Sequence, residues 1–163
     1  MSWSCSGKAV VDGVAPAPHE EEACPGPLCF EADATDRLAE TAALLAMCVA
    51  EPDAPQGKSD GLRVGAVEVL EATDLDVTLR LTLVNTSPDF VSSYPGLGLS
   101  IFRDDALVGS SQSGMYYGIG GCEALSSEVR LAWELVQGAR LVVSATNDLG
   151  AETVDSIAFT LIR

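Results

Sequence analysis

Histidine is almost missing from this sequence, with His19 the single example in 163 residues. A Ser-His-Asp or Cys-His catalytic arrangement would have to take its histidine from the stretch PAPHEEEA, which has the composition of a solvated spacer. A zinc site rich in histidine cannot be formed at all. We therefore expect no enzyme of these kinds, no cofactor and no bound metal.

Basic residues are also few, and long apolar runs are missing. The 24 acidic residues against 9 lysines and arginines give a net charge of -15, which repels phosphate backbones and anionic lipid surfaces. The longest apolar run, AALLAMCVA at Ala42–Ala50, is far shorter than the ~20 residues that span a bilayer. The composition therefore predicts a protein with no nucleic-acid partner and no transmembrane segment.

What the sequence does contain is enough apolar residue for a packed core. It is 47% hydrophobic and 20% charged, which is typical of a globular chain, and its length allows one ordinary domain with a smaller appendage. The stretch EPDAPQGKSD, at 51–60, is rich in residues that break regular structure and marks the boundary. We expect a flexible N-terminal tether over 1–23, a small disulfide-stapled helical appendage and linker over 24–60, and one domain over 61–163.

Residues 32–50 are predicted to form an amphipathic helix. The apolar positions that recur at helical spacing are Leu38, Ala42, Leu45, Cys48 and Val49. Asp33 or Thr35 can cap the start of this helix, and Pro52 ends it. We expect the apolar stripe to pack against the domain that follows.

Beyond the linker the period of the apolar residues changes from 3.6 to 2. In LDVTLRLTLVN the alternating residues are Leu75, Val77, Leu79, Leu81 and Leu83. Alternation of this kind is typical of a strand with one face in water. The same pattern recurs at 97–101, 129–133, 141–145 and 157–161, with turn sequences between these segments.

These strands predict the fold of the main domain. Residues 61–163, with about seven short strands, match the ~100 residues and seven strands of an immunoglobulin-type sandwich. The segment GARLVVSATNDLGAETVDSIAFTL also resembles the last two strands of bacterial immunoglobulin-like and fibronectin-like modules, where an AT-D-x-G corner joins them. The predicted fold is mainly β: an immunoglobulin-like antiparallel β-sandwich, preceded by a flexible tether and one amphipathic helix.

The first cysteine lies in Ser4-Cys5-Ser6-Gly7, which resembles the junction of a bacterial lipoprotein. Ser4 is the small residue expected before the lipid-bearing cysteine, whereas Ser2 and Trp3 replace the usual aliphatic residues, and no charged and then apolar leader precedes them here. The resemblance implies that Met1–Ser4 is what remains of a truncated or replaced leader and that Cys5 is the lipid attachment site, whereas the plainer interpretation is a frayed N-terminus with an incidental cysteine. It also implies a place in the bacterial cell envelope, in the periplasm or on the outer surface, with the lipid as the only membrane contact.

The other four cysteines are predicted to form two disulfides. Removing Cys5 leaves Cys24, Cys29, Cys48 and Cys122, an even number. We expect one of the first two to bond to Cys48 and the other to reach Cys122, so that the appendage is attached to the main domain. Four thiolates could instead bind zinc, but the spacing has none of the short CxxC-type pairs that such sites favour.

Tyr116 and Tyr117 are the candidate contact residues. They are adjacent in GMYYGIGG, so on a strand one ring should point outward and the other inward. An exposed tyrosine beside glycine-rich loops could contact a sugar or a protein, whereas an ordinary surface aromatic on an edge strand is the plainer interpretation. Trp133 is predicted to lie in the core, and Asn85-Thr86-Ser87 is interpreted as turn chemistry rather than a glycosylation site.

Three functions remain open after these exclusions. The leading one is a non-enzymatic exported bacterial lipoprotein, a binding or structural module whose partner is a protein or a surface glycan. The alternative is an accessory subunit that docks onto a larger exported assembly. The third is a hydrolase that uses carboxylates alone. Its candidate residues, which fall in predicted turns and form no calcium-loop motif, are Asp104, Asp105, Glu123, Asp148 and Asp155.

Overall fold

The computed structural model describes residues 26–52 and 61–163. Its elements in chain order are β1 (Leu28–Phe30), α1 (Ala34–Ala50), β2 (Leu62–Ala72), β3 (Asp76–Asn85), β4 (Gly96–Arg103), β5 (Ala106–Met115), β6 (Ala124–Ala132), α2 (Trp133–Val136), β7 (Arg140–Asn147), the 3-10 turn η1 (Asp148–Gly150) and β8 (Glu152–Leu161). The predicted tether over 1–23, with Cys5 and His19, lies outside the described residues, as does Cys24 of the predicted appendage. No helix within the described ranges is long and apolar enough to cross a membrane.

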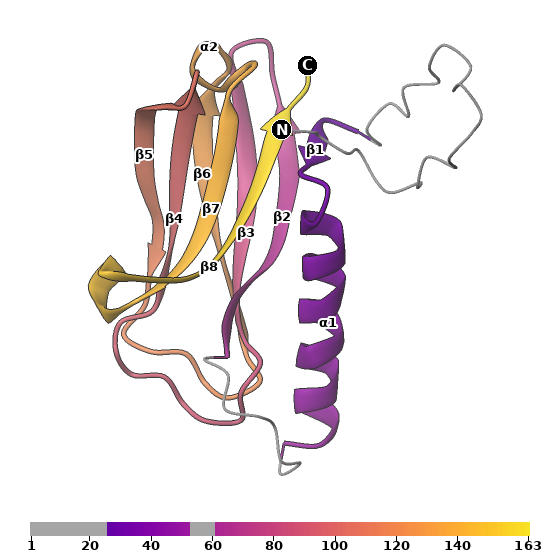
Figure 1. Ribbon diagram of the computed structural model, residues 1–163, viewed down its shortest axis with the longest axis vertical. Coiled ribbons are helices and arrows are strands. Elements are labelled where there is room, and N and C mark those ends of the chain that lie inside the picture. Colours follow the sequence, from indigo (N-terminus) through magenta and orange to yellow (C-terminus); the bar gives the residue numbers. More distant parts are fainter. Residues whose placement is uncertain (1–25, 53–60) are drawn as a thin grey trace, which may run out of the picture.

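The strands form two antiparallel sheets that pack face to face (Figure 1). One sheet has the order β1-β8-β7-β4-β5 and the other the order β2-β3-β6, and each neighbouring pair is antiparallel. Apart from the added β1, the smaller sheet holds the first, second and fifth strands of the domain (β2, β3 and β6). The larger sheet holds the third and fourth strands and the last two (β4, β5, β7 and β8), a division similar to that of immunoglobulin domains. The predicted immunoglobulin-like sandwich is confirmed.

The core consists of the alternating residues that the sequence marked. The inward side chains on β3 and β4 are buried: Val77, Leu79, Leu81, Leu83, Leu97, Leu99 and Ile101. Phe159 of β8 is fully buried and contacts Phe30 of β1, with ring centroids 6.1 Å apart. Leu75 is the exception, because it lies in the β2–β3 turn and is 76% exposed. The Thr73 hydroxyl accepts the backbone N–H groups of Leu75 and Asp76 and holds that turn.

Helix α1 begins at Ala34, and Asp33 is its N-cap residue without a side-chain cap hydrogen bond. Its buried residues are Ala34, Thr41 and Cys48, each one heptad from the next. The predicted stripe was therefore wrong in part, since Ala42 and Val49 are exposed. The C-terminal half of α1 is apolar on almost every side, so the spacing of its apolar residues did not indicate which face is buried.

Three kinds of contact join the segment 26–52 to the sandwich. β1 extends the larger sheet by pairing with the C-terminal end of β8. The Arg37 guanidinium of α1 donates to the Asp155 carboxylate and to the Ser156 carbonyl, while the other Asp155 oxygen accepts the Val64 N–H at 2.9 Å. Glu31 accepts from Arg140 at 2.8 Å, and this hydrogen bond raises the pKa of the Arg140 guanidinium.

The third contact is covalent, a disulfide between Cys48 of α1 and Cys122 of the β5–β6 loop. Cys29 is also disulfide-bonded. The sequence predicted that Cys24 and Cys29 would bond to Cys48 and Cys122, one to each. This pairing is wrong, because Cys48 and Cys122 bond to each other. The expected attachment of the helix to the sandwich does exist, through this different pair.

Candidate functional site

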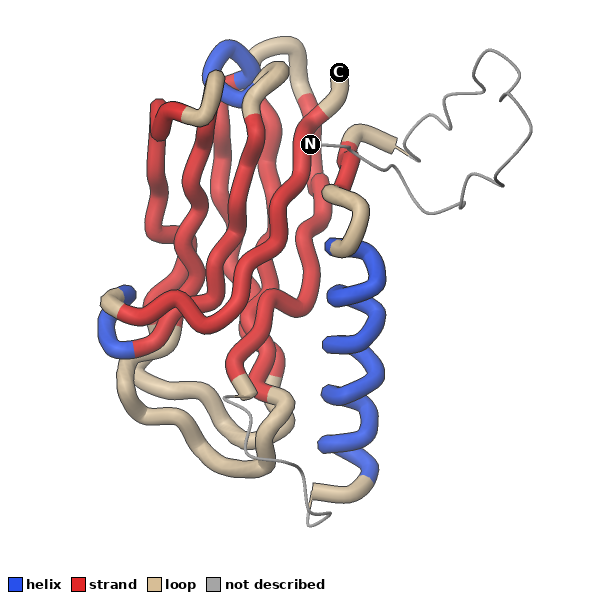
Figure 2. The backbone as a smooth tube through the Cα atoms, viewed as in Figure 1, coloured by secondary structure: helices blue, strands red, loops and turns tan. Residues whose placement is uncertain are grey.

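Three loops at one end of the sandwich form the candidate site, which we call the loop end. They are the β3–β4 loop (86–95), the β5–β6 loop (116–123) and the β7–β8 connection (148–151). Figure 2 shows the first two loops close together at the end where α1 terminates. These connections correspond to the loop set that carries binding residues in many immunoglobulin-like domains, because a rigid sandwich presents such loops from a fixed base.

Asn85, at the end of β3, joins the β3–β4 and β5–β6 loops. Its side chain is fully buried, and its amide donates to the Asp89 carbonyl at 2.7 Å and to the Gly120 carbonyl at 3.1 Å. Its side-chain oxygen accepts the Ser87 N–H at 3.0 Å. One buried amide thus satisfies three backbone groups on two loops, which agrees with the interpretation of Asn85 as turn chemistry.

Backbone contacts extend this junction. Val91 and Ile119 exchange two backbone hydrogen bonds at 3.0 and 2.9 Å, and the Cys122 N–H donates to the Ser87 carbonyl at 2.9 Å. Cys122 has a φ of 55°, in the left-handed region that a residue with a Cβ seldom adopts. Its disulfide to Cys48 therefore fixes the β5–β6 loop both to the helix and in an uncommon backbone conformation.

Gly121 is the point of closest approach between the two loops. A Cβ there would lie 1.9 Å from the Pro88 carbonyl oxygen, which is backbone and cannot turn aside. We predict that Gly121→Ala separates the loops and lowers the free energy of unfolding by about 1–3 kcal/mol, as overpacking does. Urea unfolding measures this change. The matched control is Gly98→Ala on β4, where a Cβ meets nothing within 4 Å; an equal loss in both variants would contradict the close approach.

Aromatic side chains lie exposed on the outside of the joined loops. Phe90 is 64% exposed, Tyr94 41% and Tyr117 86%. The Tyr94 and Tyr117 rings contact each other at 5.9 Å between centroids. Phe90 lies over Gly118, where a Cβ would be 2.3 Å from its Cζ. Tyr94 and Tyr117 thus form a ring pair and Phe90 lies against the residue after Tyr117; we call these three exposed residues, which lie on two joined loops, the aromatic cluster.

Tyr117 points outward and Tyr116 inward, as predicted from their adjacency in the sequence. Tyr116 packs against the core, and its hydroxyl is buried without a hydrogen-bond partner. They follow β5 rather than lie within it, and the Tyr116 N–H donates to the Pro95 carbonyl at 2.9 Å. Sequence reasoning missed Phe90 and Tyr94; the signal was the composition TSPDFVSSYP, whose Tyr and Ser residues are typical of binding loops.

The acidic residues considered for hydrolysis are dispersed, and several have structural partners. Asp104 and Asp105 form the two-residue β4–β5 turn, with φ of 51° and 61°, as a type I′ turn requires. Glu123 accepts the Gly120 N–H at 2.6 Å, and Asp155 pairs with Arg37. Within residues 26–52 and 61–163, no group of three or more His, Cys, Asp or Glu side chains could hold a metal ion.

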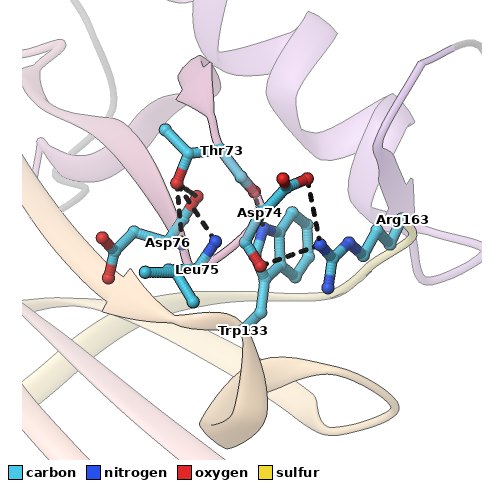
Figure 3. A network of polar contacts seen from close by, with 6 residues as sticks. All are labelled: Thr73, Asp74, Leu75, Asp76, Trp133 and Arg163. Carbon is cyan, nitrogen blue, oxygen red and sulfur yellow. Dashed lines mark hydrogen bonds and ion pairs between the residues drawn. The ribbon is translucent and has the colours of Figure 1, made fainter.

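A hollow lies at the opposite end of the sandwich. It is an open depression of about 600 Å³ lined by Pro27, Ala72, Thr73, Asp74, Trp133, Ile162 and Arg163. Trp133 is buried as predicted, although in α2 rather than in a strand. Its indole N–H donates to the Thr73 carbonyl at 2.7 Å. The Arg163 guanidinium lies 5.9 Å from the Trp133 ring centroid and donates to the Asp74 carbonyl (Figure 3). The polar groups here are used within the protein, so the depression offers fewer free contacts than the loop end.

No family model and no curated protein matches the chain. Three solved structures illustrate its likeness to known folds. A β-glucosidase from Kluyveromyces marxianus aligns with 63% of this chain at 11% identity and a TM-score of 0.36, over 14% of its own chain. Chicken MD-1 complexed with lipid IVa aligns with 59% of this chain, at 15% identity and a TM-score of 0.36, over 78% of its own chain. A Pseudomonas fluorescens alkylpurine DNA glycosylase aligns with 78% of this chain, at 14% identity and a TM-score of 0.41, over 36% of its own chain. These likenesses are distant and carry no function to this chain.

Proposed function

We propose that this chain is a non-enzymatic binding module of the bacterial cell envelope, anchored through a lipid on Cys5, that binds its partner at the loop end. The observation that carries the proposal is the aromatic cluster of Phe90, Tyr94 and Tyr117 on two loops that Asn85 joins, one of which a disulfide fixes to α1. Exposed rings on a rigid base supply contact area with little loss of conformational freedom on binding.

The loop composition supports a binding role in a second way. Tyrosine, serine, glycine and asparagine dominate antibody binding loops, because tyrosine supplies rigid contact area while small polar residues supply hydrogen bonds. The β3–β4 loop reads TSPDFVSSYP and the β5–β6 loop YYGIGGCE. Tyr117 is the contact residue in this proposal, and Tyr116 positions it by packing beneath the loop.

The cysteines support the proposed compartment. Structural disulfides persist mainly in oxidising compartments such as the periplasm, and the Cys48–Cys122 bond joins residues 74 positions apart in the sequence. The lipid on Cys5 stays a proposal that rests on the lipoprotein-like junction.

Thiol trapping in cells tests the compartment. Bacteria that express the chain from its genomic locus are quenched with acid, and free thiols are labelled before and after reduction. We expect Cys48 and Cys122 to be labelled only after reduction, because the envelope keeps the bond oxidised. The same chain directed to the cytosol is the control and should label without reduction.

Labelling of Cys48 and Cys122 without reduction in the native setting would contradict the proposed export. Incorporation of an alkynyl fatty acid tests the anchor separately, with Cys5→Ser as the variant expected to lose the label. Retention of the label in Cys5→Ser would place any lipid elsewhere.

A further inference from the structure

The charge of the loop end is one-sided. Asp89, Glu123 and Asp148 are exposed on the loops of residues 86–95, 116–123 and 148–151, and those loops contain no lysine, arginine or histidine. Two of the three carboxylates, those of Asp89 and Asp148, have no side-chain partner among the interactions described above, whereas Glu123 accepts the Gly120 N–H. Among the described residues, these three loops therefore contribute only negative charge around the aromatic cluster.

The β7–β8 connection brings one of these charges beside the rings. The Ser93 hydroxyl donates to the Asn147 side-chain oxygen at 2.6 Å, which places the residue before Tyr94 against the residue before Asp148. Asp89 directly precedes Phe90 in the chain. Acidic residues of the β3–β4 loop and of the β7–β8 connection are thus next to residues that carry or adjoin the rings.

Two kinds of attraction then act on the same kind of ligand. The face of an aromatic ring carries negative potential and attracts a guanidinium or ammonium group within about 6 Å. The flanking carboxylates attract the same cation through charge and hydrogen bonds. A neutral sugar could stack on the rings and donate its hydroxyls to the carboxylates, but it would gain nothing from their charge, and an anionic ligand would be repelled by them.

We infer that the loop end binds a protein segment that presents arginine or lysine side chains to the cluster of Phe90, Tyr94 and Tyr117. This inference rests on the proposed binding function and specifies the chemistry of the partner. Recognition by a few aromatic anchors surrounded by complementary charge is common at protein interfaces. The acidic surface would favour the encounter, and the rings would give it a defined place.

A titration of the full chain, labelled with nitrogen-15, tests this inference at physiological salt. The probes are a blocked tetra-arginine peptide, a blocked tetra-glutamate peptide and the neutral oligosaccharide maltohexaose. We expect tetra-arginine to shift the backbone amide signals of the three loops, and the other two probes to leave them unchanged. Tyr94→Ala combined with Tyr117→Ala should weaken tetra-arginine binding about tenfold, since two ring contacts are removed.

A matched pair of acid-to-amide variants separates local recognition from the overall negative charge. Asp89→Asn with Asp148→Asn should weaken binding about as much as the tyrosine variant. Asp104→Asn with Asp105→Asn removes the same charge from the exposed β4–β5 turn at the opposite end and should leave binding unchanged. Equal weakening by both pairs would overturn the inference, because attraction by net charge alone would explain it.

Two further outcomes separate this inference from the proposed function. Loop shifts with maltohexaose but not with tetra-arginine, lost on Tyr117→Ala, would overturn the cationic partner and keep the binding module. Loop signals that respond to no probe would overturn the inference and count against the binding function as well. Unshifted core signals in each variant verify that the sandwich stays folded.

Discussion

Replacing both Cys48 and Cys122 with alanine is expected to lower the free energy of unfolding by about 4 kcal/mol. The bond joins residues 74 positions apart, and in the chain-entropy model a cross-link over a loop of that length removes about this much freedom from the unfolded chain. Alanine is used because Cys48 is fully buried, and a serine hydroxyl there would lose its hydrogen bonds to water. Urea unfolding, followed by far-UV circular dichroism, measures the change.

The disulfide variant also tests the loop end. Without the bond, nothing covalent holds Cys122 at its φ of 55°, so the amides of the β5–β6 loop should exchange with solvent faster, while those of β3 and β7 stay protected. Intact mass before and after reduction should show that the bond of Cys29 remains. A loss of stability below about 1 kcal/mol would contradict the role of this disulfide.

Asn85→Ala is expected to lower the free energy of unfolding by about 3 kcal/mol. The substitution leaves the Asp89 and Gly120 carbonyls and the Ser87 N–H without their partner, and each buried polar group that loses its hydrogen bond costs about 1–3 kcal/mol unless water reaches it. Asn85→Asp retains the acceptor for Ser87 but places a buried carboxylate oxygen against the Asp89 and Gly120 carbonyl oxygens, so it should lose at least as much stability as Asn85→Ala. Urea unfolding of the three proteins gives the order.

A control substitution shows whether the loss belongs to the buried junction. Gln137→Ala removes an amide of similar size from an exposed position after α2, where surface substitutions change stability by less than about 0.5 kcal/mol. Similar losses in Asn85→Ala and Gln137→Ala would contradict the bracing role. Loss of tetra-arginine binding in Asn85→Ala, with the core signals intact, would link the junction to the proposed contact.

Much of the sandwich could be predicted from the sequence, because a strand buried on one face has an apolar residue at every second position. Leu79, Leu81 and Leu83 follow this pattern and are all fully buried. β5 could not be recognised in this way. Its sequence, ALVGSSQSGM, forms an edge strand with most of its residues exposed, so apolar and polar residues do not alternate along it. β1 has three residues, too few for a period to be recognised.

The disulfide pairing and the face of α1 could not be predicted for a different reason. Both depend on how elements distant in the sequence meet, and the nearly uniform apolar sequence TAALLAMCVA allows several faces to be buried. Tyr117 was found because its neighbour had to point the other way. Asn85 was recognised as a turn residue, but its two loop partners become visible only when the β3–β4 and β5–β6 loops are placed side by side.

The pairing of β1 with β8 fixes the end of the sandwich at which the N-terminal side of the described chain begins. Leu28 pairs with Leu161 at the last residue of β8, so the chain enters the sandwich at the end opposite to the aromatic cluster. Strands of ten residues, such as β3, separate the two ends by roughly 30 Å at about 3.3 Å per residue. With a lipid on Cys5, the described part of the chain would begin at the end opposite to Phe90, Tyr94 and Tyr117 and would leave these rings in reach of a partner approaching from solution.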